Sequence, residues 1–201
     1  MTDSPALISF LIFCLVLTGT PGPNNMMVLV SAARAGVVGA MPLIAGIAGG
    51  SALLLAGIGL GLGNLVSAIP WLQTAMKVAG AGLLLWIAAQ IAFSGPIGRE
   101  DDDRAPVGIW RGAAFQWVNP KAWAVTTGAV FTYLPVEPTI ADIGLAACVL
   151  AGASVSTLLI WASGGAVLRR FLRRPVFATV FNGVAASLLA ASIVPLWVPM
   201  R

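Results

Sequence analysis

The sequence predicts an all-α membrane protein with six transmembrane helices, arranged as two inverted three-helix repeats whose first helices are broken. Three observations support this fold class: an apolar composition, two breaks within apolar runs, and similar motifs in the two halves. Of the 201 residues, 59% are apolar and 9% are charged. Soluble domains carry about 45–50% apolar and about 25% charged residues. We therefore expect the chain to cross a membrane several times.

A transmembrane helix needs about 20 mostly apolar residues, and the apolar runs are long enough for six spans. They cover residues 5–33, 37–66, 71–93, 109–133, 140–168 and 176–198. The first run is too long for one straight span and is interrupted at residues 20–25. We expect a single transmembrane transporter domain over residues 1–201, with inverted repeats at approximately 1–98 and 104–201.

Basic residues follow the odd-numbered spans and predict the orientation of the chain. They lie after the first, third and fifth spans, at Arg34, at Arg99, Arg104 and Arg111, and at Arg169, Arg170, Arg173 and Arg174. Because loops rich in Lys and Arg face the cytoplasm, we expect both termini outside. Trp71, Trp110 and Trp197 lie at the expected span ends, where tryptophan anchors helices at the membrane interface.

Small-residue motifs recur in the same order in the two halves. Ala48-Gly49-Gly50-Ser51 resembles Ala151-Gly152-Ala153-Ser154, and the segment 80–84 resembles the segment 185–189. Because each half has three spans, an odd number, the second half must be inverted relative to the first. Inverted repeats with corresponding broken helices are typical of secondary transporters whose site lies near the membrane midplane.

The first break is the segment Thr20-Pro21-Gly22-Pro23-Asn24-Asn25. Prolines and glycine interrupt a helix, and lipid offers no partner for the freed backbone groups. We expect Thr20 to cap a half-helix that resumes near Pro21, with free N–H groups that bind an anion such as a substrate carboxylate. Asn24 and Asn25 add neutral amide groups. The alternative is a proline kink whose polar groups are satisfied by neighbouring helices.

The second break is Asn119-Pro120-Lys121, about half a chain away. Lys121 is expected near the middle of the bilayer, where a charge costs about 2.5–3.5 kcal/mol and by default marks a functional site. It could bind a carboxylate or exchange a proton; the alternatives are snorkelling to the interface or capping the carbonyls of a broken helix. Gln116, Thr126 and Thr127 either line a cavity or form interhelical hydrogen bonds.

Other residues are interpreted structurally. Gly46 with Gly50, and Gly57 with Gly61, are expected to form close-packing helix faces. Lys77 is expected to snorkel and Asn182 to hydrogen-bond between helices. The sequence has no histidine and no cluster of metal-ligand type, so we expect no metal and no cofactor. It has no basic stripe with interleaved aromatic residues, so we expect no nucleic acid partner.

Several motifs resemble those of one family, the LysE/RhtB superfamily of amino-acid exporters. They are the segment Thr20 to Asn24, Gly36, the small-residue segment 45–51, the segment Lys77-Val78-Ala79-Gly80-Ala81, and Phe115-Gln116-Trp117-Val118-Asn119-Pro120-Lys121-Ala122-Trp123. The resemblance covers essentially the whole chain. The first and last motifs are also similar to the branch that includes cysteine and O-acetylserine exporters.

The resemblance implies a multi-pass protein of the bacterial inner membrane that exports small amino acids or derivatives, driven by protons. Many relatives have an acidic residue after the TPGP motif, where this chain has Asn24, and another near Ser51. Their absence argues against basic amino acids as substrates. It also leaves the residue that carries the proton unidentified.

Together these observations predict a secondary active exporter of a small, neutral amino acid, with alternating access. The residues expected to bind the substrate lie at the two breaks: Thr20, Pro21, Gly22, Pro23, Asn24, Asn25, Gln116, Asn119, Pro120 and Lys121. Expected partners are the amino acid, protons as the candidate coupling ion, the lipid bilayer and, as a candidate, further copies of the chain. The alternatives are a structural or assembly protein whose breaks serve packing, and an intramembrane enzyme, which lacks an evident base and nucleophile.

Overall fold

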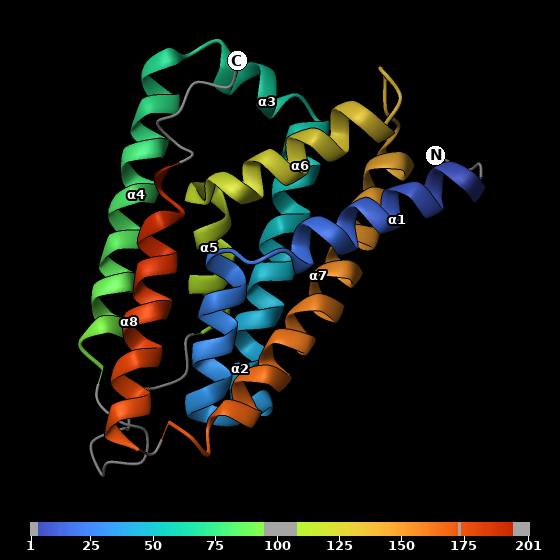
Figure 1. Cartoon of the computed structure of the whole chain (residues 1–201). Helices are drawn as coiled ribbons and strands as arrows, with labels where there is room; N and C mark the ends of the chain where they lie inside the picture. The colour runs from blue at the N-terminus through green and yellow to red at the C-terminus, as the bar shows by residue number, and fades with distance from the viewer. Residues whose placement is uncertain (1–3, 95–107, 173, 195–201) are drawn as a thin grey trace.

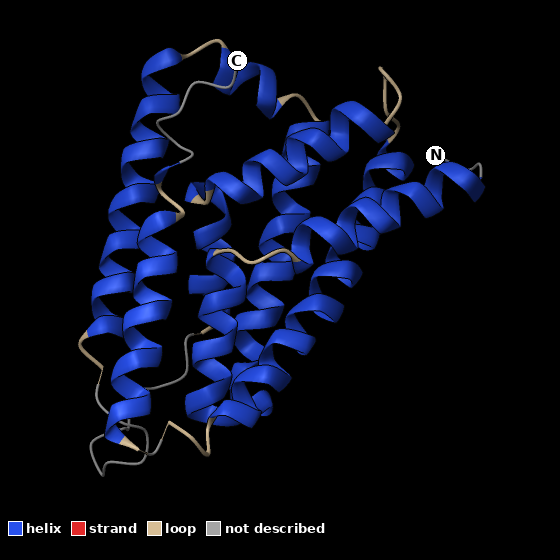
Figure 2. Ribbon diagram, viewed as in Figure 1, coloured by secondary structure: helices blue, strands red, loops and turns tan. Residues whose placement is uncertain are grey.

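The structure is a computed structural model, and it describes residues 4–94, 108–172 and 174–194. The regular structure in these residues is helical (Figure 2). The helices, labelled in Figure 1, are α1 (Ser4–Gly19), α2 (Pro23–Gly59), α3 (Leu62–Ser67), α4 (Pro70–Ala92), α5 (Ile109–Val118), α6 (Pro120–Tyr133), α7 (Ile140–Leu168) and α8 (Pro175–Ala191).

Three of these helices are long and apolar enough to cross a membrane: Pro23–Gly59, Trp71–Ala92 and Ile140–Leu168. Helices α1 and α8 are apolar but shorter. Large apolar side chains cover the outside of the bundle, for example Val38 at 83% and Trp71 at 71% exposed. Exposure of such a surface to water is unfavourable in free energy, whereas contact with acyl chains is not. The all-α membrane class predicted from composition is therefore confirmed.

Helix α2 is a helical hairpin, because its direction reverses at Gly36. This residue has φ 77° and ψ 174°, a conformation that side chains other than hydrogen disfavour. The reversal divides α2 into residues 23–35 and 37–59, which run down and then back up in Figure 1. It lies between the first two predicted apolar runs, as expected for the connection between them.

The helix bounds agree with most of the predicted runs. Helices α4 and α7 match the runs at 71–93 and 140–168, and the run at 109–133 is divided into α5 and α6 as expected. The prediction that the second run continues to residue 66 was wrong. The helix ends at Gly59, and Gly61, with φ 102°, turns the chain into α3. The charged cluster at 99–104 and Trp197 lie outside the described residues.

The α2 hairpin occupies the centre of the bundle, where it packs against both α7 and α5. Helices α4 and α8 form a pair at one side of the molecule, as Figure 1 shows. Asn182 on α8 ties this pair together by donating a hydrogen bond to the Ser94 carbonyl oxygen at 2.6 Å, which confirms its predicted role between helices. Helices α1 and α6 lie side by side and oblique to the rest, joined by Phe10, Phe13 and Tyr133.

Glycines bring the central helices into backbone contact. A Cβ at Gly50 would lie 2.7 Å from the Cα of Ala113 on α5, and one at Gly46 would overlap the Ile109 carbonyl. The predicted packing face at Gly46 and Gly50 is confirmed. The corresponding prediction for Gly61 was wrong, because no atom lies within 4 Å of a Cβ built there and its positive φ serves the turn after α2.

This packing predicts that Gly46→Ala lowers the stability of the protein. The added methyl group has to displace backbone at Ile109, and overpacking of this kind costs about 1–3 kcal/mol. Gly49→Ala is the matched control, because a Cβ there meets no atom within 4 Å and alanine favours the helix. Unfolding in detergent should show a lower midpoint for Gly46→Ala alone. Equal midpoints for the two variants would contradict the proposed contact.

Candidate functional site

The first break interrupts the chain between α1 and α2. Gly22 is extended, with φ and ψ both −178°, and Pro23 is the first residue of α2, a favoured position for proline. The predicted role of Thr20 as a helix cap was wrong. Its hydroxyl donates to the Val16 carbonyl oxygen at 2.6 Å, so Thr20 extends the last turn of α1, and the N-cap of α2 is Gly22, without a side-chain cap.

The carbonyl groups freed at the end of α1 are bound by side chains from three other helices. The amide nitrogen of Asn25 donates to the carbonyl oxygens of Thr18 at 2.9 Å and Gly19 at 3.3 Å. Trp161 of α7 also donates to Gly19, at 3.1 Å. Lys121 of α6 donates through Nζ to the Thr20 carbonyl. The first break is therefore satisfied inside the protein, as an apolar environment requires.

The second break lies at Asn119, between α5 and α6. Asn119 has an extended backbone, with φ −85° and ψ 110°. Its side-chain oxygen accepts a hydrogen bond from the Lys121 backbone N–H at 3.1 Å, and Pro120 is the first residue of α6. This is a regular N-cap. The asparagine and the proline of the motif thus end one half-helix and start the next.

A network of neutral amide side chains joins the two breaks. Asn24 and Gln116 exchange two hydrogen bonds, of 2.9 and 3.1 Å. Asn119 donates to the same Asn24 oxygen at 3.2 Å, and Ser51 donates to the Gln116 oxygen at 3.3 Å. Gln116 is 0% and Asn119 1% exposed. Segments more than 90 residues apart in sequence are thereby brought into direct contact.

Lys121 is half-buried and lies across the first break. A Cβ at Gly22 would be 2.9 Å from its Cδ atom, so the lysine stem fills the space that the missing side chain leaves. Its ammonium group caps the freed carbonyl of Thr20, one of the roles considered from the sequence. Lys121 also lines the adjacent cavity. Lys121 therefore caps a backbone carbonyl and is also accessible from the cavity.

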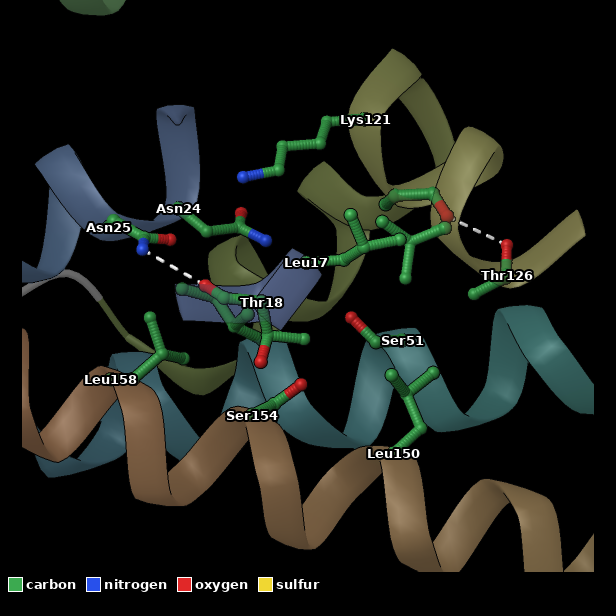
Figure 3. A pocket seen from close by; sticks show the side chains of 13 residues that line it. Leu17, Thr18, Asn24, Asn25, Ser51, Lys121, Thr126, Leu150, Ser154 and Leu158 are labelled. Carbon is green, nitrogen blue, oxygen red and sulfur yellow. Dashed lines mark hydrogen bonds between the residues drawn. The ribbon is translucent and has the colours of Figure 1, made fainter. Parts of the chain in front are cut away.

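The cavity beside the breaks has a volume of about 30 Å³ and is shown in Figure 3. Its polar lining consists of Thr18, Asn24, Asn25, Ser51, Lys121, Thr126 and Ser154. Its apolar lining consists of Leu17, Ile47, Ala122, Val125, Leu150 and Leu158. This volume suffices for a water molecule but is too small for an amino acid.

The sequence-predicted residues have different places around this cavity. Asn24, Asn25 and Lys121 line it. Gln116 and Asn119 stand behind Asn24 and hold it. The backbone at the two breaks is shaped by the remaining predicted residues, Pro21, Gly22, Pro23 and Pro120. Thr20 is bonded to the last turn of α1.

Sequence reasoning missed Thr18, Ser154 and Trp161 as members of this region. Thr18 and Ser154 line the cavity, and Trp161 caps α1. The similarity between the motifs ending at Ser51 and Ser154 could have found Ser154, because both serines line the same cavity. Of the two threonines considered, Thr126 lines it while Thr127 is not among the lining residues.

The chemistry of the lining limits what the site can do. Among the residues that the structure describes, the lining has one charged side chain, Lys121, and no acidic one. Within the described ranges, no three His, Cys, Asp or Glu residues are grouped as metal ligands. A helical membrane protein with two interrupted helices around a small polar cavity has the features of a transporter.

Comparison with known proteins identifies the family. The sequence pattern of the LysE type translocator family matches residues 15–195. The chain therefore belongs to the LysE type translocator family, and it is a transporter and not an enzyme.

Curated relatives have similar lengths. The cysteine/O-acetylserine efflux protein of Escherichia coli O157:H7 is 31% identical over 191 residues, which cover 92% of this chain and 95% of the relative. The proteins of the same name from Escherichia coli K12 and Shigella sonnei are each 30% identical over the same shares. No solved structure matches the chain significantly.

The amide network predicts that Asn24 and Gln116 are energetically coupled. Asn24→Ala removes both hydrogen bonds that Gln116 exchanges with Asn24 and leaves the buried side-chain nitrogen of Asn119 without its acceptor, which costs about 1–3 kcal/mol. Unfolding of Asn24→Ala, Gln116→Ala and the double variant should give a coupling energy of about 0.5–3 kcal/mol. Gln90→Ala, on the exposed face of α4, is the control and should be additive with Asn24→Ala. Additivity of the Asn24 and Gln116 variants would contradict the network.

Proposed function

We propose that this protein is a secondary active exporter of a small, neutral amino acid or derivative. The observation that carries the proposal is the meeting of two helix breaks at one cavity, joined by the Asn24–Gln116 pair. Transporters of this kind bind substrates where half-helix ends meet near the membrane midplane. The family and the efflux function named for its relatives support the same conclusion.

The two ends of the first break suit the two charges of an amino acid. The substrate carboxylate would bind Lys121 and the N-terminal end of α2, which has no side-chain cap and carries partial positive charge. The substrate ammonium would bind the carbonyl oxygens at the end of α1, where Asn25 now donates. The binding groups for the carboxylate and those for the ammonium both lie at the first break. A zwitterion therefore fits this arrangement better than an anion or a cation alone.

The absence of an acidic side chain in the cavity lining favours a neutral substrate. A basic amino acid would bring a second cation next to Lys121 without a counter-charge, which is unfavourable in a low-dielectric site. The relatives are named for the efflux of cysteine and O-acetylserine, both of which are small and carry neutral side chains. We infer that the substrate of this protein belongs to the same size and charge class.

We further propose that the chain forms one domain of six spans in two inverted repeats. In this scheme α1 with residues 23–35 is the counterpart of α5 with α6, and residues 37–59 are the counterpart of α7. This scheme is supported by Ser51 and Ser154, which end the similar motifs of the two halves and both line the cavity. Rocking of one repeat against the other would open the cavity to each side in turn. We assign proton coupling to Lys121, which is the one ionisable group in the lining that the structure describes.

The direct test is transport by the purified protein in vesicles with an imposed pH gradient. We expect efflux of small neutral amino acids such as cysteine, serine and O-acetylserine, and no efflux of lysine or arginine. Collapse of the pH gradient should stop accumulation. A protein that moves no member of this panel, although correctly inserted, would instead support a structural or assembly role for the helix breaks.

Lys121→Ala is expected to lower transport about tenfold to 100-fold, because a charge-assisted hydrogen bond to the carboxylate contributes about 1.5–3 kcal/mol. Lys77→Ala is the matched control, since Lys77 is exposed on α4 and away from the cavity lining. Initial efflux rates at equal amounts of inserted protein are the measurement. Unchanged rates in Lys121→Ala would exclude this residue from the transport mechanism.

The orientation of the chain in the bacterial inner membrane is also a proposal. Ala33 packs with Leu172, so Arg34 and the arginines at 169, 170 and 174 lie at the same end of the bundle. Such an accumulation of arginine favours the cytoplasmic side and supports an orientation with both termini outside.

Thiol labelling in intact cells tests this orientation. In a background without Cys14 and Cys148, an impermeant reagent should label Val136→Cys, which is fully exposed between α6 and α7, from outside. Arg170→Cys, at the arginine-rich end, should be labelled only after permeabilisation. The reverse pattern would show that the chain has the opposite orientation.

A further inference from the structure

Ser154 presents a hydroxyl group to the cavity without a hydrogen bond. The side chain is 3% exposed and lines the cavity from α7. The other three hydroxyls of the lining each donate to a protein oxygen: those of Thr18, Ser51 and Thr126. Within the part of the chain that the structure describes, the Ser154 hydroxyl has no such partner.

A partner within the helix was available to Ser154 and is not used. Serine and threonine in helices commonly donate to the carbonyl four residues earlier, and Ser156, Thr157 and Ser163 of α7 do so at 2.8–3.0 Å. Ser154 instead directs its hydroxyl toward the space between α7 and α2, and Ser51 lines the same cavity from α2 (Figure 3). A hydroxyl that leaves its own helix and is accessible only from the cavity points to a partner that enters the cavity.

We propose that Ser154, together with Ser51, forms the subsite that recognises the side chain of the substrate. The inference rests on the proposed export of a small amino acid and adds which side chains are selected. Ser51 uses its hydrogen on Gln116, so its oxygen is left as an acceptor, whereas Ser154 is left as a donor. This pair is complementary to a hydroxyl or thiol, which can accept and donate. An ester carbonyl would accept from Ser154 alone.

Apolar neighbours set the length and charge that the subsite accepts. Leu150 and Leu158 lie four residues before and after Ser154, on the same face of α7, and both line the cavity. They enclose the hydroxyl between two hydrocarbon walls. A charged side chain would lose its hydration there without gaining a counter-charge. The subsite is thus specific for a short, uncharged side chain with a hydrogen-bonding group.

The test is the substrate selectivity of Ser154→Ala in vesicles. Efflux of serine, cysteine and O-acetylserine is compared with that of alanine, which has the same α-amino and α-carboxyl groups but no hydrogen-bonding side chain. We expect the ratio of serine to alanine transport to fall about fivefold to tenfold, since one neutral hydrogen bond is lost. Ser156→Ala is the control, because its hydroxyl is exposed and bonded to the Gly152 carbonyl, and its ratio should equal that of the wild type.

Each outcome decides the proposal. An unchanged ratio in Ser154→Ala, or an equal loss for alanine and serine, would overturn the side-chain subsite. Ser154→Cys, a weaker donor of similar size, should lower the ratio in the same direction and replaces the alanine variant if that variant does not insert. A wild-type protein that transports none of these amino acids contradicts the proposed export itself, whereas wild-type export with unchanged selectivity contradicts only this subsite.

Discussion

A helix that is interrupted inside a membrane has to find partners within the protein for its freed backbone groups, because hydrocarbon offers none. This constraint organises the centre of the molecule. The carbonyls at the end of α1 are bound by Asn25, Trp161 and Lys121, which come from α2, α7 and α6. Each of these helices is therefore held at a fixed place relative to the break. The cavity lies beside this break and is lined by two of these partners, Asn25 and Lys121.

The breaks are joined by neutral amides, and this affects how easily the helices can separate. A buried ion pair would be expensive to separate, since breaking it leaves uncompensated charges. Hydrogen bonds between amides contribute about 0.5–1.5 kcal/mol each, so the Asn24–Gln116 pair can hold one arrangement and still exchange for another. Contacts of this moderate strength suit the proposed rocking of the two repeats, in which the cavity of about 30 Å³ enlarges to admit a substrate.

Small residues make this network geometrically possible. Glycines such as Gly46 and Gly50 allow the second part of α2 to approach the backbone of α5. At that separation a short side chain such as Ser51 reaches Gln116 directly. Larger residues would increase the distance between the helices and deprive the amide of Gln116, which is 0% exposed, of its hydrogen bond from Ser51. Packing and polar satisfaction are thus two aspects of one arrangement.

The sequence by itself determined the membrane class, most helix bounds and the position of both breaks, because apolar runs, proline and glycine act locally on the backbone. It did not determine which side chains satisfy the breaks. Thr20, a reasonable cap by local rules, is bonded to the last turn of α1, whereas the contact of Asn24 with Gln116 spans 92 residues. The unpaired hydroxyl of Ser154 likewise depends on what surrounds it. Only the tertiary structure decided these partners, because a hydrogen bond requires two groups at a particular distance, and long-range packing sets that distance.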